Sequence, residues 1–129
     1  MDLSELDLTA KADAGAEMRL HHPVTDEPLS TDDGKPITIR VLGQDSREFR
    51  AAAAELAERM QNRKRLSVAA AEAQSVELLS RCVKAWSGIV WEGKPLPCTP
   101  ENVRMVLRER KWVRDQVDAF VTDRAAFFR

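Results

Sequence analysis

The chain has 129 residues, a formal net charge of -1 and no tyrosine, with 20 lysines and arginines against 21 aspartates and glutamates. This length suits one domain with one modest hydrophobic core, which argues against several independent domains. Hydrophobic residues make up 43% of the chain, but many of them are alanines and only 5% of all residues are aromatic. Alanine favours helix more than it fills volume, so we expect a thin core that leaves room for further burial in a homo-oligomer or with a partner.

Charge is distributed unevenly along the chain. Residues 1–45 carry ten acidic and four basic side chains, whereas residues 46–129 carry eleven acidic and sixteen basic ones. A basic helical half can attract nucleic acid. Its arginines, however, are interleaved with glutamate and aspartate, which is typical of a solvated helix face. Nucleic-acid binding is therefore not the preferred interpretation, and a small DNA-associated regulator is kept as an alternative function.

The sequence indicates a cytoplasmic protein without a membrane segment. No run approaches the roughly 18 apolar residues needed to span a bilayer. The start, Met1–Glu5, lacks the basic and then apolar pattern of a signal peptide. Cys82 and Cys98 do not have CxxC spacing, so we interpret both as reduced thiols.

The N-terminal third predicts a flexible arm followed by a small β segment. Residues 1–15 are polar with scattered leucines and are expected to form the arm. The alternation of apolar and polar residues from Ala16 to Leu20 and again over residues 37–41 predicts two strands, and residues 29–31 could pair as a stub. We therefore expect residues 16–44 to form a small antiparallel β-hairpin or three-stranded meander.

Residues 45–129 are expected to form a four-helix, mostly α domain that packs with the β segment. Asp45 or Ser46 can cap a first helix, which should run to about Gln61. Ser67 can cap a second, longer helix whose apolar seam continues at steps of three and four residues to about Val90. The apolar stripe of the first helix comprises Phe49, Ala53, Leu56 and Met60, and the seam of the second comprises Val76, Leu79, Val83, Trp86 and Val90.

The C-terminal part predicts two further helices. Thr99 and Pro100 form a helix start, because threonine is a good cap and proline is tolerated at the first helical position. A fourth helix should start near Trp112 and reach the terminal phenylalanines. No proline or glycine separates these two helices, so one bent helix is the alternative. The inward residues are Val103, Val106 and Leu107 in the third helix and Val113, Val117, Phe120 and Val121 in the fourth. The fold class is therefore α+β, in a single compact domain.

No catalytic, cofactor-binding or metal-binding residues are assigned, and we do not expect an enzyme. His21 and His22 are neighbours in an expected strand and should point to opposite faces. They could share a metal ion with Cys82 and Cys98 only through a distorted backbone, and the spacing does not match common zinc sites. No sequence pattern of a nucleophile with its base accompanies them.

The large aromatic side chains are the candidate partner-binding residues. Core packing is their ordinary role, and the alternative is that some of them anchor a partner from an exposed patch. Phe127 and Phe128, if both were helical, would lie about 100° apart, so one of them should be left for a partner. The candidates are Trp86, Trp91, Trp112, Phe120, Phe127 and Phe128.

A series of motifs over about residues 75–129 resembles the tail assembly chaperones of long-tailed bacteriophages. These are Trp86-Ser-Gly-Ile, Gly93-Lys-Pro-Leu-Pro, Thr99-Pro-Glu-Asn-Val, Val113-Arg-Asp-Gln-Val, and Phe120-Val-Thr-Asp-Arg before an aromatic end. Their order and spacing carry the resemblance, and the β segment is similar to what some members have. Lys111-Trp112 departs from it, because a proline-containing turn is expected there.

The resemblance implies a non-enzymatic chaperone that binds the tape measure protein and assists polymerisation of the major tail tube protein around it. It also implies action in the host cytoplasm, absence from the mature virion and, in many members, a longer form made by ribosomal frameshifting. The other alternative that we keep is a minor head-tail connector or virion component.

Overall fold

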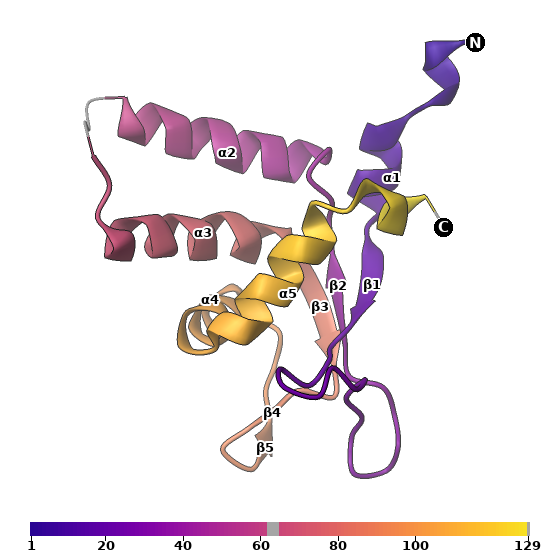
Figure 1. Ribbon diagram of the computed structural model, residues 1–129, viewed down its shortest axis with the longest axis vertical. Helices are drawn as coiled ribbons and strands as arrows, with labels where there is room; N and C mark the ends of the chain where they lie inside the picture. Colours follow the sequence, from indigo (N-terminus) through magenta and orange to yellow (C-terminus); the bar gives the residue numbers. More distant parts are fainter. Residues whose placement is uncertain (62–64, 129) are drawn as a thin grey trace.

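The computed structural model describes residues 1–61 and 65–128 and has the expected α+β fold. A small antiparallel sheet forms one layer, and helices pack against one of its faces (Figure 1). Helix α2 (Arg47–Met60) and helix α3 (Val68–Cys82) run antiparallel and extend away from the sheet. Among the described residues, none of the helices combines the length and the apolar content needed to cross a membrane.

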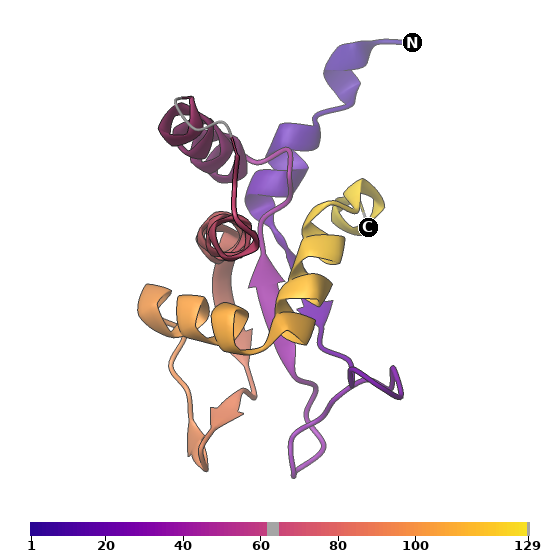
Figure 2. The ribbon, with the colours of Figure 1, turned by 60° about the vertical axis from the view of Figure 1, so that its left-hand side comes forward.

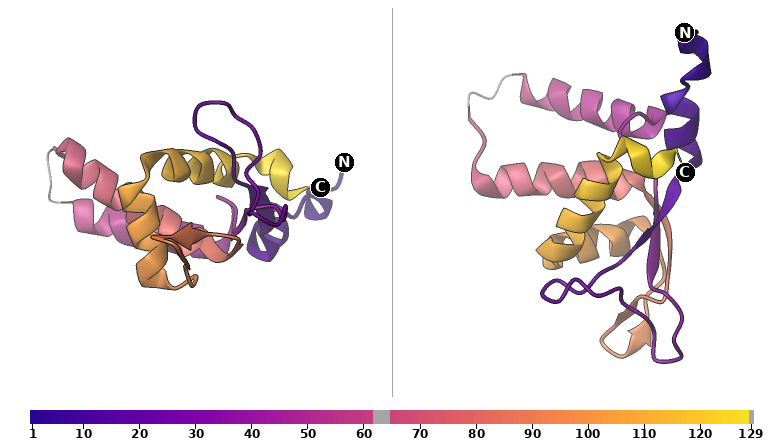
Figure 3. Two further views of the ribbon diagram at one scale, coloured as in Figure 1. Left: turned by 90° about the horizontal axis from the view of Figure 1, so that it is seen from below. Right: turned by 45° about the vertical axis from the view of Figure 1, so that its right-hand side comes forward.

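The three-stranded sheet has one buried and one exposed face. Strand β2 (Thr38–Val41) lies between β1 (Ala16–Arg19) and β3 (Val83–Ser87), and both pairings are antiparallel. Ile39 lies opposite Met18 on one side and opposite Trp86 on the other, so the three side chains share a face. Helix α3, helix α4 (Pro100–Glu109) and helix α5 (Lys111–Val121) cover this face, as the right-hand view of Figure 3 shows. The other face carries exposed residues, among them Glu17, Arg40 and Ala85.

Strand β3 corrects the prediction that the second helix continues to about Val90. Helix α3 ends at Cys82, and Val83 is already extended, with φ -80° and ψ 121°. The backbone of residues 83–87 pairs instead with β2. The third strand therefore does not come from residues 29–31, which form only an isolated bridge between Ser30 and Pro36. Val90, expected on the inner seam, has 57% of its surface exposed.

Three helices begin directly after residues that the sequence indicates as N-caps. Ser46, Ser67 and Thr99 each accept a hydrogen bond, at 3.1 Å, from the backbone N–H three residues further on. They precede α2, α3 and α4 (Pro100–Glu109), respectively. Of the two candidates for the first cap, Ser46 is the one used, and it is completely buried. The expected stripe of α2, including Phe49 and Leu56, is half-buried.

Helices α4 and α5 (Lys111–Val121) are separate, so the alternative of one bent helix is wrong. The helical conformation is interrupted at Arg110, whose φ of -125° and ψ of 88° are not helical. Figure 2 shows the angle between the two helices. The expected inward valines of α4 and α5 are buried: Val103, Val106, Val113, Val117 and Val121. Helix α5 stops before the terminal phenylalanines, which follow on the short 3-10 turn η2 (Arg124–Phe127) and just after it.

Residues 1–15, expected to form a flexible arm, contain two short helical segments. Residues Leu3–Glu5 form the 3-10 turn η1, and residues Leu8–Ala14 form helix α1, which Asp7 caps through a 2.9 Å hydrogen bond to the backbone N–H of Ala10. Ala12 is buried, and its carbonyl oxygen accepts from the backbone N–H of Gly43 at 3.2 Å. Helix α1 lies beside η2, so segments near the two termini pack together (Figure 1).

Candidate functional site

A groove of about 830 Å³ opens at the end of the molecule that lies away from the two termini. Three parts of the chain form its walls: the connection between β1 and β2, the segment from Gly88 through strand β4 (Val90–Trp91) to Glu92, and the break between α4 and α5. Figures 1 and 2 show these loops at the lower end of the molecule. The groove brings together residues that lie far apart in the sequence.

The first wall is a loop that is folded back on itself by backbone hydrogen bonds. Leu20 N–H donates to the Ile37 carbonyl at 3.0 Å, Ile37 N–H donates to the Leu29 carbonyl at 3.1 Å, and Leu29 N–H donates to the Leu20 carbonyl at 2.8 Å. These three apolar side chains line the groove, and Asp32 and Asp33 stand at its rim. The backbone N–H groups of these three residues are thus already paired within the loop.

The second wall ends in a tight hairpin. Strand β4 pairs with β5 (Lys94–Pro95), and the two residues between them, Glu92 and Gly93, have φ values of 49° and 82°. Positive φ at both central positions is the conformation that closes a two-residue hairpin in the sense of the sheet twist. The hairpin holds Trp91 half-buried in the groove and leaves Val90 exposed next to it.

Gly88 holds the two walls close together. Its φ is +86°, and a Cβ atom at this position would lie 2.8 Å from Cγ2 of Thr31 and 3.1 Å from Cγ1 of Ile37. An L-residue would therefore meet both an unfavourable backbone conformation and a steric clash. The close approach of residue 88 to residues 31 and 37 depends on the missing side chain.

The α4–α5 break supplies the third wall. Trp112 and Val113, in the first turn of α5, line the groove together with Val106 of α4. The guanidinium carbon of Arg110 lies 4.7 Å from the centroid of the Trp91 ring, a cation–π contact between the break and β4. At a partly exposed site such a contact contributes about 0.5–1 kcal/mol. The second and third walls are thus joined by Trp91 and Arg110.

The groove has an apolar floor and an acidic rim. The carboxylates of Asp32, Asp33 and Glu92 lie at its edge, where Arg110 is the basic residue of the lining. Asp33 accepts a hydrogen bond from the Thr31 hydroxyl and has Lys35 at 3.8 Å. Among the described residues, no ion pair involves Asp32 or Glu92. The rim therefore retains negative charge available to a bound molecule.

The groove contains two of the six candidate residues, Trp91 and Trp112. Trp86 is half-buried on the inner face of the sheet, and its Nε1–H donates to the Leu96 carbonyl at 2.7 Å. Phe120 and Phe127 pack edge to face with ring centroids 5.5 Å apart. Phe127 is buried, whereas Phe128 has 43% of its surface exposed, so one of the two neighbours does face solvent. Partner binding by any of the six stays a prediction.

Sequence reasoning missed the acidic rim and Arg110 as parts of this site. The pair Asp32-Asp33 before Gly34 is an ordinary turn sequence, and Arg110 lies between two expected helices, so no local pattern assigns them to a site. The sequence signal for Arg110 is weak. It lies in the segment that departs from the expected proline-containing turn, but nothing local predicts its contact with Trp91.

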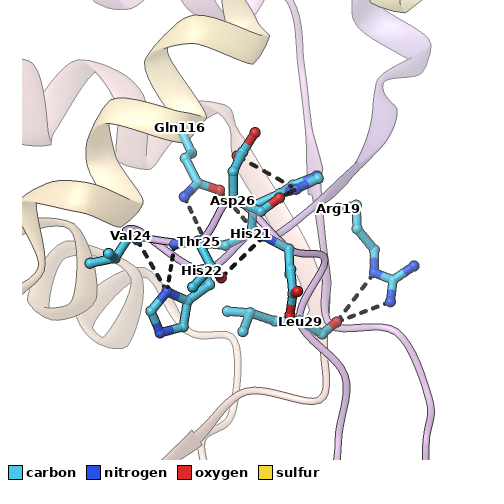
Figure 4. A network of polar contacts seen from close by, with 9 residues as sticks. Arg19, His21, His22, Val24, Thr25, Asp26, Leu29 and Gln116 are labelled. Atoms are coloured by element: carbon cyan, nitrogen blue, oxygen red, sulfur yellow. Dashed lines mark hydrogen bonds and ion pairs between the residues drawn. The ribbon is translucent and has the colours of Figure 1, made fainter.

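The two histidines take part in the turn that follows β1 (Figure 4). Nδ1 of His21 lies 3.0 Å from the carbonyl oxygen of Asp26, and Nδ1 of His22 accepts from the backbone N–H groups of Val24 and Thr25 at 3.1 and 3.2 Å. Within residues 1–61 and 65–128, no group of three or more histidine, cysteine or acidic side chains is arranged to hold a metal ion. The histidine ring nitrogens stabilise the turn.

The two cysteines are poorly suited to nucleophilic chemistry. Cys82 is completely buried, and this burial raises the pKa of its thiol to about 12. Burial also raises the pKa of the half-buried Cys98. Because the thiolate is the reactive form, both residues are expected to react slowly at neutral pH.

Comparisons with protein-family models, with curated proteins and with solved structures return no match for this chain. The groove and the order of the C-terminal motifs are therefore the two observations on which a function can be based. Of these, the groove is a physical feature of the described residues, and the motif order is a resemblance.

Proposed function

We propose that this chain is a tail assembly chaperone of a long-tailed bacteriophage. In this role it binds the tape measure protein without covalent chemistry and assists polymerisation of the major tail tube protein around it. The observation that carries the proposal is the apolar groove at one end of the molecule, with Trp91 and Trp112 in its walls. The order of motifs over about residues 75–129 supports the same role.

The motifs behind the resemblance are mainly residues that build the helical layer. Thr99 caps α4, and the Asn102 side chain donates to the Pro97 carbonyl at 2.9 Å, which fixes the turn before that helix. Arg114 is buried, donates to the Leu107 carbonyl at 3.3 Å and lies 3.7 Å from Glu72. These contacts connect α5 to α4 and α3, and they position the break that forms one wall of the groove.

The size and chemistry of the groove suit a shielding role. About 830 Å³ accommodates a few large side chains of a partner but not a folded domain. A long, helix-rich tape measure protein presents many apolar segments, and many copies of a small chaperone can cover them one by one. Homo-oligomers and a frameshifted longer form would add further sites in the same assembly, because linked sites bind more tightly than single ones.

A DNA-associated regulator is the less favoured alternative. Several arginines of the basic half face carboxylates: Arg59 lies 2.9 Å from Glu77, Arg81 lies 2.9 Å from Glu48, and Arg124 lies 2.7 Å from Asp45. Each such pair reduces the positive charge that a phosphate backbone would meet. A mobility-shift assay across a salt series tests this alternative, since phosphate binding must weaken steeply as salt increases.

Coexpression tests the proposed function. The chain would be produced with the very long, helix-rich reading frame expected downstream of its gene, and soluble product would be measured with and without the chain. We expect the long product to become more soluble and to copurify with the chain. If neither happens, the chaperone role is wrong. Detection of the chain in purified virions would instead support a minor connector or virion component.

A further inference from the structure

We propose that the groove recognises a short amphipathic helix whose apolar side chains are flanked by lysine or arginine. This inference rests on the proposed function only in assigning the helix to the tape measure protein. The recognition chemistry follows from the groove itself. It has an apolar floor, two tryptophans and a rim on which carboxylates predominate.

The floor determines the apolar half of the ligand. The aliphatic lining consists of the half-buried Leu29, Ile37 and Ile89 and of the buried Leu20, Val106 and Val113, and Trp91 and Trp112 line the same groove. The segment β4 adds Val90, which is more than half exposed and lies beside Trp91. Such a surface gains free energy by covering large apolar side chains, and the two indoles are the residue type most often found at binding hot spots.

The hydrogen bonding of backbone N–H groups in the groove walls favours a helical ligand over an extended one. A strand would need a row of free N–H and C=O groups on the groove wall. In the β1–β2 connection the N–H groups of Leu20, Leu29 and Ile37 are all bonded within the loop, and Leu96 N–H donates to the Ile89 carbonyl at 3.0 Å on the other side. A helix satisfies its own backbone and presents only side chains, so its binding requires none of these paired groups.

The rim determines the charge of the ligand. Asp32, Asp33 and Glu92 come from two different walls, so a ligand lying between the walls passes close to carboxylates on both sides. The guanidinium of Arg110 already lies on the Trp91 ring, 4.7 Å from the centroid, so the carboxylates are the groups left for a cation of the ligand. A lysine or arginine of the ligand would be attracted to these carboxylates, whereas a glutamate would be repelled.

Two synthetic peptides test this inference. Both would be 18-residue amphipathic helices with the same leucine face, one with lysines and one with glutamates flanking it, and binding to the full chain would be measured by fluorescence anisotropy. We expect the lysine peptide to bind at least about tenfold more tightly at low salt, with the difference shrinking as salt increases. Equal affinities, tighter binding of the glutamate peptide, or no binding of either would overturn the inference.

Replacement of the rim carboxylates by amides tests whether the preference for the lysine peptide originates at the rim. The variant Asp32→Asn/Asp33→Asn/Glu92→Gln should lose most of the preference for lysine. A matched control changes three exposed carboxylates elsewhere, Glu17→Gln/Glu58→Gln/Asp118→Asn, and should keep the preference. Circular dichroism and unfolding curves of both variants verify that each is folded. A preference that survives in the rim variant would contradict the inference.

The two proposals can fail separately. If the long downstream product is solubilised equally by the wild type and by the rim variant, the chaperone function stands and the charge recognition is wrong. If the lysine peptide binds in a rim-dependent way but the long product neither dissolves nor copurifies, the charge recognition stands and the chaperone function is wrong.

Discussion

The side-chain amide of Gln116 forms hydrogen bonds with both the N–H and the carbonyl group of His21, although 95 positions separate the two residues. Its Oε1 accepts from the His21 N–H at 3.0 Å, and its Nε2 donates to the His21 carbonyl at 2.9 Å (Figure 4). The contact connects α5 to the chain just beyond β1, next to Leu20 in the groove wall. Gln116 belongs to the Val113-Arg-Asp-Gln-Val motif, so part of the resemblance consists of residues that position the groove.

Replacement of Gln116 should destabilise the protein. In Gln116→Ala both backbone groups of His21 lose their partner, and a partly buried polar group left unpaired costs about 1–3 kcal/mol of unfolding free energy. Asp118→Ala, at an exposed position of the same helix, should change it by less than about 0.5 kcal/mol. Urea unfolding followed by tryptophan fluorescence measures both. Equal stability of the two variants would show that the contact contributes little.

Alanine substitutions at two glycines distinguish the cost of a steric clash from the cost of a positive φ. Gly88→Ala places a methyl group 2.8 Å from Thr31 at φ +86°, whereas Gly93→Ala has a similar φ of +82° but no atom within 4 Å. We expect Gly93→Ala to cost about 1 kcal/mol and Gly88→Ala clearly more, about 2–3 kcal/mol. Thermal or urea unfolding provides the comparison. If Gly88→Ala is no worse than Gly93→Ala, the two groove walls are not held together at this point.

The pair Asp45 and Arg124 should make stability depend on pH in the acid range. Arg124 donates two hydrogen bonds to Asp45, at 2.7 and 3.0 Å, and these lower the pKa of the carboxyl group in the folded state. A lowered pKa stabilises the fold above the unfolded-state value of about 3.9, and this contribution is lost as pH falls through the lower folded-state pKa.

Asp45→Asn removes that contribution. Because the guanidinium is largely exposed, the loss of unfolding free energy at pH 7 should be below about 1 kcal/mol. The difference from the wild type should shrink as pH falls below the unfolded-state value of about 3.9 and vanish below the lowered folded-state pKa of Asp45. Asp32→Asn, which removes a carboxylate without an ion pair among the described residues, serves as the control. A difference that grows on acidification would contradict this account.

The two thiols should differ in reactivity. Burial raises the pKa of Cys82 to about 12 and gives it no solvent contact, whereas Cys98 is half-buried. At about pH 8, iodoacetamide should therefore alkylate Cys98 faster than Cys82 by roughly two orders of magnitude. Peptide mass spectrometry measures the two rates, and labelling in urea should make them similar. Equal rates in the folded protein would mean that α3 opens easily near its end.

The parts of the fold that local chemistry determines could be predicted from the sequence. Ser67 and Thr99 start their helices as expected, because a cap acts on N–H groups only a few residues away. The buried valines of α4 and α5 follow from helical periodicity for the same reason. Two strands of the sheet are also visible as alternating runs.

Strand β3 could not be predicted, because its apolar residues follow the helical pattern. Val83 and Trp86 lie three positions apart, which continues the seam of α3, whereas in a regular strand this spacing would place them on opposite faces. The register of the β2–β3 pairing shifts between Arg40 and Val41, so the strand is irregular at this point. What decides is the pairing of residues 83–87 with β2, a segment about forty positions earlier. Helix α1 is similar: seven residues form a marginal helix alone, and its packing beside η2 is a distant contact.

The candidate site was predicted only in part, for a related reason. Trp91 and Trp112 are recognisable in the sequence as large apolar side chains. The sequence does not show that these two line one groove, or that Trp86 lies outside it. Their proximity depends on the α4–α5 break and on Gly88, whose effects are tertiary. Asp32 and Asp33 of the acidic rim also fit an ordinary turn sequence, so local sequence does not distinguish the two roles.

The most direct test of the central claim, that the groove binds the tape measure protein, compares two exposed valines. Val90 lies in the groove lining with 57% of its surface exposed, and Val24 lies outside it with 85% exposed, so neither substitution by serine should unfold the protein. Each variant would be coexpressed with the candidate tape measure protein, and the amount that copurifies would be quantified. We expect Val90→Ser, alone and with Trp91→Ala, to reduce it several-fold, and Val24→Ser to leave it unchanged. Copurification that is equal for all folded variants would contradict the assignment of binding to this groove.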